Sequence, residues 1–487
     1  MSSIHIGVTA SGDAVSLPLR LVNRHGAITG VTGSGKTTTM QAIIEQLSAA
    51  GVPVFAADIK GDLSGVAVPG EARGPVAARM GELGRRFEPK GFPVAFWDIF
   101  GAHGVPIRTS VQAMGAVLLS RMLGLNPTQE GAMEICFRKS EDERSYMLTL
   151  DDLRWSLNDM LEEREEVCRQ YGNVTASSIS AIQRNLLALE AQGGDRLFGE
   201  PPFDISDLMK VGPDGRGVIS LLHADRLMEA PKLYATFLLW LLTELFRRLP
   251  EAGDLAKPKL VFFFDEAHLL FNDAPKPLIQ QIERLVRLVR SKGVGVFFVT
   301  QSPTDVPATV LEQLGTRILH AMRAHTAESL RKIRAAADTI RPRKGFNTRE
   351  ALPVLATGEA LVSVIAEDNI PSEVQKVRVI PPQGQIGPVS ELERRVQIDA
   401  GAMARKYPAG DDPKAAYAFN RRMLSERGID PGPEFEPLPY EPGLYLKHVP
   451  IIDIGAERGP GVMRRLMGIA FWSVITWGAV SVLVAIV

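Results

Sequence analysis

The chain has too few cysteines for a disulfide-stabilised or zinc-binding fold. Its 487 residues include two, Cys136 and Cys168. Their spacing matches no metal-ligand motif, and they cannot form a disulfide framework, so we expect a protein of a reducing compartment. The first residues also lack a charged stretch followed by an apolar run, so we expect no secretory signal peptide.

The chain also lacks an excess of either charge. It has 55 lysines and arginines against 56 aspartates and glutamates, a net charge of −1. This balance gives no global basic signature for nucleic-acid binding and does not exclude it, because a local basic patch would suffice. Hydrophobic residues make up 45% of the chain and charged residues 23%, as in an ordinary globular protein. The length accommodates two or three domains.

A complete phosphate-binding loop is present at residues 30–37, which read GVTGSGKT and match G-x-x-x-x-G-K-[ST]. Glycines in such a loop let consecutive backbone N–H groups point at phosphates. Lys36 is expected to reach the β- and γ-phosphates, and the Thr37 hydroxyl to bind Mg²⁺. An apolar strand at 26–29 and a helix over 38–50 are predicted on either side, which places a helix N-terminus under the phosphates. The predicted nucleotide-binding residues are Gly30, Gly33, Ser34, Gly35, Lys36, Thr37 and Thr38.

A second motif indicates hydrolysis of the bound triphosphate. The apolar strand predicted at 259–264 ends in Asp265 and Glu266. Asp265 is expected to hold Mg²⁺ together with Thr37, and Glu266 to act as the general base that polarises the attacking water. A small-molecule kinase would avoid such a base. A GTPase is disfavoured because the sequence contains no Asn-Lys-x-Asp motif.

Three further side chains are candidates for the same site. The strand predicted at 295–300 ends at Gln301, which either orients water and senses the γ-phosphate or caps the following turn. Arg317 and Arg323 are candidates for an arginine finger supplied by a neighbouring subunit, and a structural salt bridge is the competing interpretation for both. The basic residues of the helix predicted at 278–290 either form a solvated surface or contact phosphates.

Changes in composition divide the chain into five parts. Residues 1–110 and 211–380 alternate strands and helices, whereas residues 111–210 are helical and read as an insertion. Residues 381–465 are a charged connector rich in proline and glycine. The last part, 466–487, contains an uncharged apolar run at 468–487, which approaches the length of a membrane-spanning helix.

Arg464 and Arg465 precede that run and no basic residue follows it. The positive-inside bias therefore predicts a cytoplasmic ATPase core tethered to the inner face of the cell membrane. A helix buried in the protein core or in an oligomer contact is the alternative.

Several stretches resemble one known family. The resemblance is to the bacterial HerA-like helicase-domain family, which belongs to the HerA–FtsK superfamily of RecA-fold ATPases. It implies a RecA-like P-loop NTPase core that forms a homo-hexameric ring with ATP at the subunit interfaces. It also implies Lys36 and Thr37 at phosphate and Mg²⁺, Asp265 and Glu266 as the Walker B pair, and Gln301 as the sensor. The matching stretches are 23–26, 30–37, 58–65, 198–202, 262–270 and 299–303.

Two functions remain open after these observations. The first is an ATP-driven, ring-forming motor that translocates or unwinds DNA. The second is a membrane-associated ATPase that drives a protein-secretion or conjugation-type machine, because one fold can serve both purposes. Both require ATP and Mg²⁺.

Overall fold

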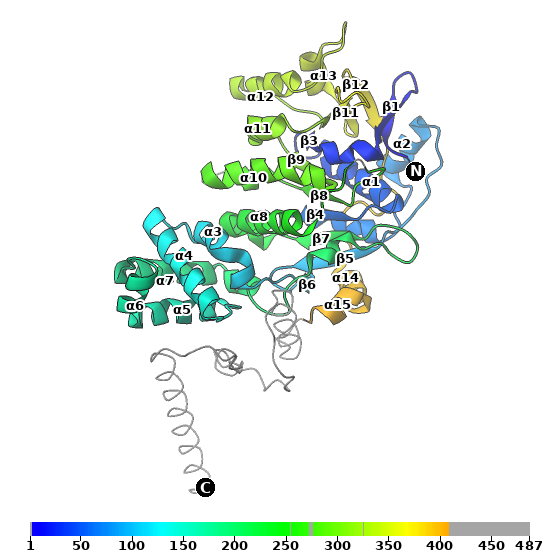
Figure 1. Cartoon of the computed structure of the whole chain (residues 1–487). Helices are drawn as coiled ribbons and strands as arrows, with labels where there is room; N and C mark the ends of the chain where they lie inside the picture. The colour runs from blue at the N-terminus through cyan, green and yellow to red at the C-terminus, as the bar shows by residue number, and fades with distance from the viewer. Residues whose placement is uncertain (1, 254, 272–275, 325, 409–487) are drawn as a thin grey trace.

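A single twelve-stranded sheet forms the centre of the protein, in the order β2-β1-β12-β11-β10-β3-β9-β8-β4-β7-β5-β6 (Figure 1). The computed structural model describes residues 2–253, 255–271, 276–324 and 326–408. The predicted apolar segment 466–487 lies outside these residues. Within them, no helix combines the length and hydropathy that crossing a bilayer requires.

The strands from β10 to β6 run parallel to one another. Every residue of β8 and β9 is buried, and both strands are almost wholly apolar, because helices cover both faces of a parallel sheet. The sequence predicted three of these strands, β3, β8 and β9, to within about one residue. The parallel strands are β3 (Gly26–Thr29), β4 (Val54–Asp58), β5 (Val94–Asp98), β6 (Val105–Pro106), β7 (Ile219–His223), β8 (Leu260–Phe264), β9 (Val294–Thr300) and β10 (Thr316–Leu319).

Antiparallel strands extend the sheet beyond β10. Two of them come from residues 3–18 and two from residues 359–379, and β1 pairs directly with β12. These strands are β1 (Ser3–Thr9), β2 (Ala14–Pro18), β11 (Glu359–Ser363) and β12 (Gln375–Val379).

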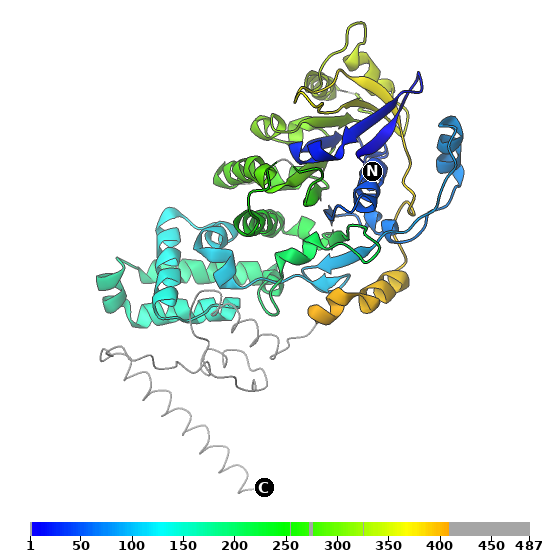
Figure 2. The same ribbon diagram turned by 45° about the vertical axis from the view of Figure 1, so that its right-hand side comes forward.

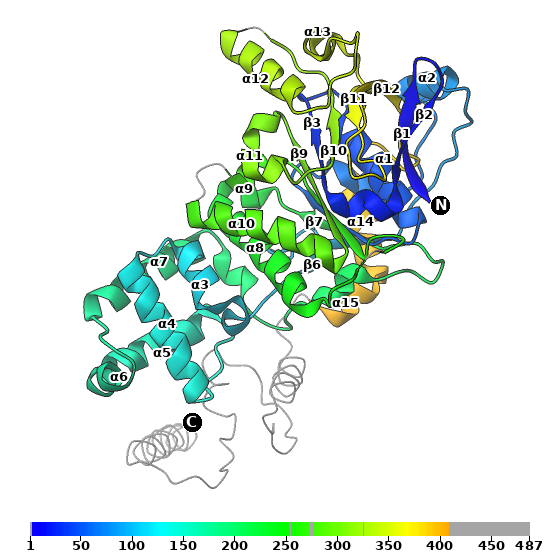
Figure 3. The ribbon, with the colours of Figure 1, turned by 45° about the horizontal axis from the view of Figure 1, so that its top comes forward.

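The two faces of the sheet pack against different helices. Along β8, Phe262 and Phe264 belong to one hydrophobic cluster and Phe263 to the other, as the alternation of side chains along a strand requires. The first cluster includes α8 (Pro231–Arg248) and α10 (Lys276–Val289), and the second includes α1 (Lys36–Ala49). Figures 1 and 3 show α8, α10, α11 (Ala308–Leu311) and α12 (Ala327–Asp338) side by side, with α1 across the sheet from them.

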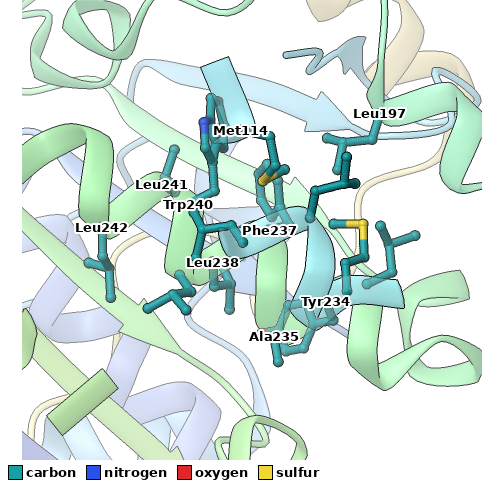
Figure 4. Packing of buried hydrophobic residues seen from close by; sticks show 14 of the residues in the cluster. Met114, Leu197, Tyr234, Ala235, Phe237, Leu238, Trp240, Leu241 and Leu242 are labelled. Atoms are coloured by element: carbon teal, nitrogen blue, oxygen red, sulfur yellow. The ribbon is translucent and has the colours of Figure 1, made fainter. Parts of the chain in front are cut away.

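The helical segment predicted at 111–210 forms a lobe beside α8 (Figure 2). Four of its helices begin after a residue whose side chain caps the helix N-terminus: Ser110, Asn126, Thr149 and Thr175. Its first helix packs on α8, where Met114 lies among Tyr234, Phe237 and Trp240 (Figure 4). The five-part division of the chain stays a prediction. The lobe contains α3 (Val111–Leu123), α4 (Pro127–Asp142), α5 (Leu150–Glu162), α6 (Arg164–Gln170) and α7 (Ala176–Ala191).

After β12 the chain crosses α1 as an extended segment, residues 383–390, which we call the strap. The N–H groups of Gln383 and Gly384 donate to the buried carboxylate of Glu45 on α1, at 2.6 and 3.0 Å. Farther along, the N–H of Gln385 donates to the Gly65 carbonyl at 3.1 Å. The strap leads to α14 (Glu391–Ala400) and α15 (Ala402–Lys406), below β5 and β6 in Figures 1 and 2. The described part of the expected connector is therefore hydrogen-bonded to α1 and to the loop that follows β4.

Candidate nucleotide-binding site

The phosphate loop connects β3 to α1 through backbone conformations that favour glycine. Gly33 and Gly35 have φ angles of 76° and 106°, in the left-handed region that side-chain-bearing residues rarely adopt. Gly30 is required for a different reason, since a Cβ there would lie 2.6 Å from the Cβ of His320. The loop is thus shaped by its glycines, as the motif predicted.

Strand pairing brings the candidate catalytic residues together. β9 lies between β3 and β8, and β8 pairs with β4, all in parallel. Their carboxyl ends therefore meet at one edge of the sheet, where the phosphate loop, Gln301 and the Asp265–Glu266 pair follow three neighbouring strands. Gln301 is exposed there, beside the strand that leads into the phosphate loop, as expected. Its role as a sensor stays a prediction.

Asp265 is a buried carboxylate at the end of β8. Its Oδ1 accepts the backbone N–H of Glu266 at 2.9 Å. Burial and the nearby charge of Glu266 raise the pKa of Asp265 to about 6. A cation bound at this carboxylate would offset both effects, which suits a Mg²⁺ ligand.

Glu266 has an unusual backbone and a charged partner. Its φ angle is 45°, which is uncommon for a residue with a side chain. Its Oε1 lies 2.5 Å from Lys60 Nζ, and its Oε2 lies 3.4 Å from Nδ1 of His268. Burial raises the pKa of Glu266, but the hydrogen bond and charge of Lys60 outweigh that effect and hold the pKa below its usual value. Glu266 is therefore ionised, as a general base must be.

Lys36 points back onto its own loop, with Nζ 3.2 Å from the carbonyl of Val31. Burial lowers the pKa of this ammonium, and the carboxylates of Glu266 and Asp265 act against that effect. The phosphate-binding lysine and the two carboxylates therefore share one electrostatic environment.

The residues present fit a triphosphate with a divalent cation. Within the described part of the chain, the buried oxygens Ser34 Oγ, Thr29 Oγ1 and Glu266 Oε2 have no hydrogen-bond partner. Ser34 Oγ and Glu266 Oε2 are therefore free to form a hydrogen bond with a bound group. A Cβ added at Gly33 would meet no atom within 4 Å, so the loop borders open space. Thr37 and Asp265 supply the oxygen ligands that Mg²⁺ prefers.

A buried histidine beneath the loop did not emerge from the sequence. His320 lies just after β10, with Nδ1 3.0 Å from the carbonyl of Glu359 and Nε2 2.9 Å from the hydroxyl of Thr39 on α1. A carbonyl can only accept, so Nδ1 carries the proton and Nε2 accepts from Thr39. Burial lowers the pKa of His320 to about 4, so the ring is neutral. A single histidine after an apolar strand was too weak a signal to predict this contact.

Both candidate arginine fingers bond to backbone carbonyls of their own chain. The guanidinium of Arg317 donates hydrogen bonds to the carbonyls of Leu311, at 2.9 Å, and of Thr339. Arg323 holds those of Leu355, at 3.0 Å, and Pro353. A role for either arginine in a neighbouring subunit stays a prediction. The basic side chains Arg284, Arg287 and Arg290, at and just after α10, are exposed.

Comparison with known sequences identifies the family. The sequence matches the family described as "Helicase HerA-like C-terminal" over residues 3–429. The chain belongs to this HerA-like family. One relative, "Probable helicase MJECL08" from Methanocaldococcus jannaschii, is 21% identical over 396 residues, which cover 74% of this chain and 68% of the relative.

Solved structures agree on the fold of this HerA-like chain. The bacterial conjugative coupling protein TrwBdeltaN70 aligns with a TM-score of 0.54 and 13% identity, over 79% of this chain and 91% of that one. VirB4 of Thermoanaerobacter pseudethanolicus aligns with a TM-score of 0.50 and 15% identity, over 78% and 96%. TrwB in complex with ADP and Mg²⁺ aligns with a TM-score of 0.51 and 14% identity, over 78% and 90%. The HerA-like chain therefore has the mixed α/β fold of RecA-like P-loop ATPases.

Proposed function

We propose that this HerA-like protein is an ATP-hydrolysing motor. One observation carries the proposal: parallel pairing of β3, β9 and β8 places a complete phosphate loop at the same sheet edge as Asp265 and Glu266. A protein that bound nucleotide without hydrolysing it would not need a buried, ionised glutamate there. The structure of TrwB with ADP and Mg²⁺ supports ATP and Mg²⁺ as ligands of the shared fold.

Each residue has a defined task in this proposal. The loop N–H groups and Lys36 bind the phosphates, while Thr37 and Asp265 hold Mg²⁺. The bound cation supplies positive charge that offsets the charge developing on the phosphates. Glu266 takes the proton of the attacking water, and Gln301 orients that water.

We further propose a homo-hexameric ring that moves DNA. The family description and the relative's name, a probable helicase, support this substrate. The alternative, an ATPase of a conjugation or protein-secretion machine, is favoured by the likeness to the conjugative coupling protein TrwB and by the membrane tether that the sequence predicts at 466–487. In either case the ATPase core is expected in the cytoplasm, at the inner face of the membrane.

The ATPase rate of the full-length protein with and without DNA tests the substrate. We expect single- or double-stranded DNA to stimulate hydrolysis several-fold, with the Lys36→Ala variant inactive throughout. Absence of stimulation by any nucleic acid would favour the protein-machine alternative. Mass measurement of the Glu266→Gln variant with ATP tests the ring, because this variant should trap the ATP-bound assembly.

A further inference from the structure

A lysine from a separate loop holds the proposed general base. Lys60 follows β4, far from Glu266 in sequence, yet its Nζ lies 2.5 Å from Glu266 Oε1. The Lys60 side chain is 45% exposed and that of Glu266 only 5% exposed. Ordering a half-exposed lysine costs side-chain entropy, and exposed ion pairs repay little of it. The contact therefore contributes little to the free energy of unfolding, and its main effect is to hold the carboxylate of Glu266 in place.

The loop that carries Lys60 is fixed on both sides. Gly61 adopts a left-handed φ of 75° immediately after Lys60. Asp58 Oδ2 accepts the N–H of Leu63 at 3.1 Å, and the Ser64 hydroxyl donates to the Gly61 carbonyl at 2.9 Å. From the strap, the N–H of Val389 donates to the same Ser64 hydroxyl at 3.1 Å. The position of Lys60 is thus set by β4 and by the strap.

The two carboxylate oxygens of Glu266 have different surroundings. Oε1 pairs with Lys60 at 2.5 Å, whereas Oε2 is buried, lies 3.4 Å from Nδ1 of His268 and has no hydrogen-bond partner within the described residues. The backbone of Glu266 is held at a φ of 45°, a conformation that persists only where its surroundings impose it. The glutamate is thus held by its backbone and by the short bond to Oε1, whereas Oε2 has the longer contact with His268 and accepts no hydrogen bond within the described residues.

We propose that Lys60 is a positioning residue for hydrolysis, whose ammonium fixes the Glu266 carboxylate so that Oε2 is the oxygen that accepts the proton of water. As Oε2 takes this proton, the water oxygen bonds to the γ-phosphorus and the bond from that phosphorus to the bridging oxygen breaks, which leaves ADP and phosphate. The inference rests on the proposed role of Glu266 as general base. Lys60 contacts Glu266 and need not touch the substrate.

Replacement of Lys60 in the full-length protein tests the inference. Lys60→Met keeps the length of the side chain and removes its charge, so we expect kcat to fall about tenfold or more. Affinity for a fluorescent, non-hydrolysable ATP analogue should change by less than about twofold, because nucleotide binding rests on Lys36. Lys60→Arg keeps the charge with a different shape and should retain an intermediate kcat.

Lys210→Met is the matched control. Lys210 is also 45% exposed and lies 2.7 Å from a buried carboxylate, that of Asp207, whose side chain is 1% exposed. It lies outside the nucleotide site, so its loss should leave kcat and nucleotide affinity unchanged. If kcat falls in Lys60→Met but not in Lys210→Met, the loss is specific to the ion pair that positions the base. Loss of an ion pair with a buried carboxylate elsewhere would then not explain it.

Two results would overturn the inference. One is an unchanged kcat in Lys60→Met; the other is a weakened nucleotide affinity at unchanged kcat, which would make Lys60 a phosphate ligand. If Lys60→Met does not fold, Lys60→Gln takes its place, because it also removes the charge, and an unchanged kcat in that variant contradicts the inference. In the Glu266→Gln background, Lys60→Met should cause no further loss. Normal turnover by Glu266→Gln alone would instead defeat the proposed function.

Discussion

Glu266 is the residue on which the proposed chemistry depends. Glu266→Gln preserves shape and removes the proton acceptor, so ATP should still bind while turnover falls by about 100-fold or more. Steady-state ATPase rates and nucleotide-binding measurements on the same preparation check this. Lys36→Ala is the contrasting variant, because it should lose nucleotide binding itself. Hydrolysis at the normal rate by Glu266→Gln would show that another group is the base.

His320 makes a separate prediction at the residue scale. His320→Leu removes the acceptor for the Thr39 hydroxyl and leaves the Glu359 carbonyl without its donor. An unpaired buried polar group costs about 1–3 kcal/mol, so we expect a lower melting temperature and weaker ATP binding, because Thr39 belongs to the helix that begins at Lys36.

His5→Leu is the control for His320→Leu. His5 bonds Ser16 across the β1–β2 hairpin, away from the nucleotide site, and its loss should leave ATP affinity intact. Equal nucleotide affinity in both variants would show that His320 does not support the phosphate loop.

The sequence predicted those site residues that belong to short motifs. The phosphate loop, Asp265 and Glu266 were found because each sits at the end of an apolar strand. The contacts of Lys60 and His320 were not, because their partners Glu266 and Thr39 lie far away along the chain. Strand pairing alone brings these groups together, and no local pattern encodes it.

At the scale of elements, the contact between the strap and α1 predicts a dependence on pH. Burial raises the pKa of Glu45 to about 7, although the N–H groups of Gln383 and Gly384 act to lower it. The folded state thus binds a proton more tightly than the unfolded state, so the stabilisation is present below the ordinary pKa of 4.5 and is lost as pH rises through about 7. This pKa shift corresponds to a change in the free energy of unfolding on the order of 3 kcal/mol.

Glu45→Gln should therefore flatten this dependence. Between pH 5 and pH 8, the wild-type melting temperature should fall by a few degrees more than that of the variant. Thermal unfolding at both pH values measures the difference. Glu134→Gln, at an exposed position of α4, is the control and should follow the wild type. Parallel curves for the wild type and Glu45→Gln would refute the linkage.

The elements themselves were predicted unevenly. Three of the buried parallel strands, β3, β8 and β9, were recognised from continuous apolar runs, and the helical lobe from its periodicity. The antiparallel strands β1, β2, β11 and β12 were not predicted, although β1, β2 and β12 alternate polar with apolar residues over part of their length and β11 is buried at four of its five residues. The strap was predicted only as part of a connector, because its proline and glycine content indicates an irregular segment. Composition cannot show that the N–H groups of this segment reach Glu45.

For the whole molecule, the two bonds of Arg317 to its own chain predict a structural role. Arg317→Ala should lower the melting temperature, because the carbonyls of Leu311 and Thr339 lose their donor. Folded Arg317→Ala should keep its ATPase activity, and mixing it with Glu266→Gln subunits should add none. Recovery of activity in mixed assemblies would instead assign Arg317 to the site of a neighbouring subunit.

The pairing of β1 with β12 also determines when this protein can finish folding. Residues 3–9 are synthesised first, but their partner strand at 375–379 emerges almost at the end of the ATPase core. At roughly 5–20 residues per second, β1 waits on the order of half a minute with an open edge. During that time β1 can pair with β2, and its other edge stays unpaired until β12 is synthesised.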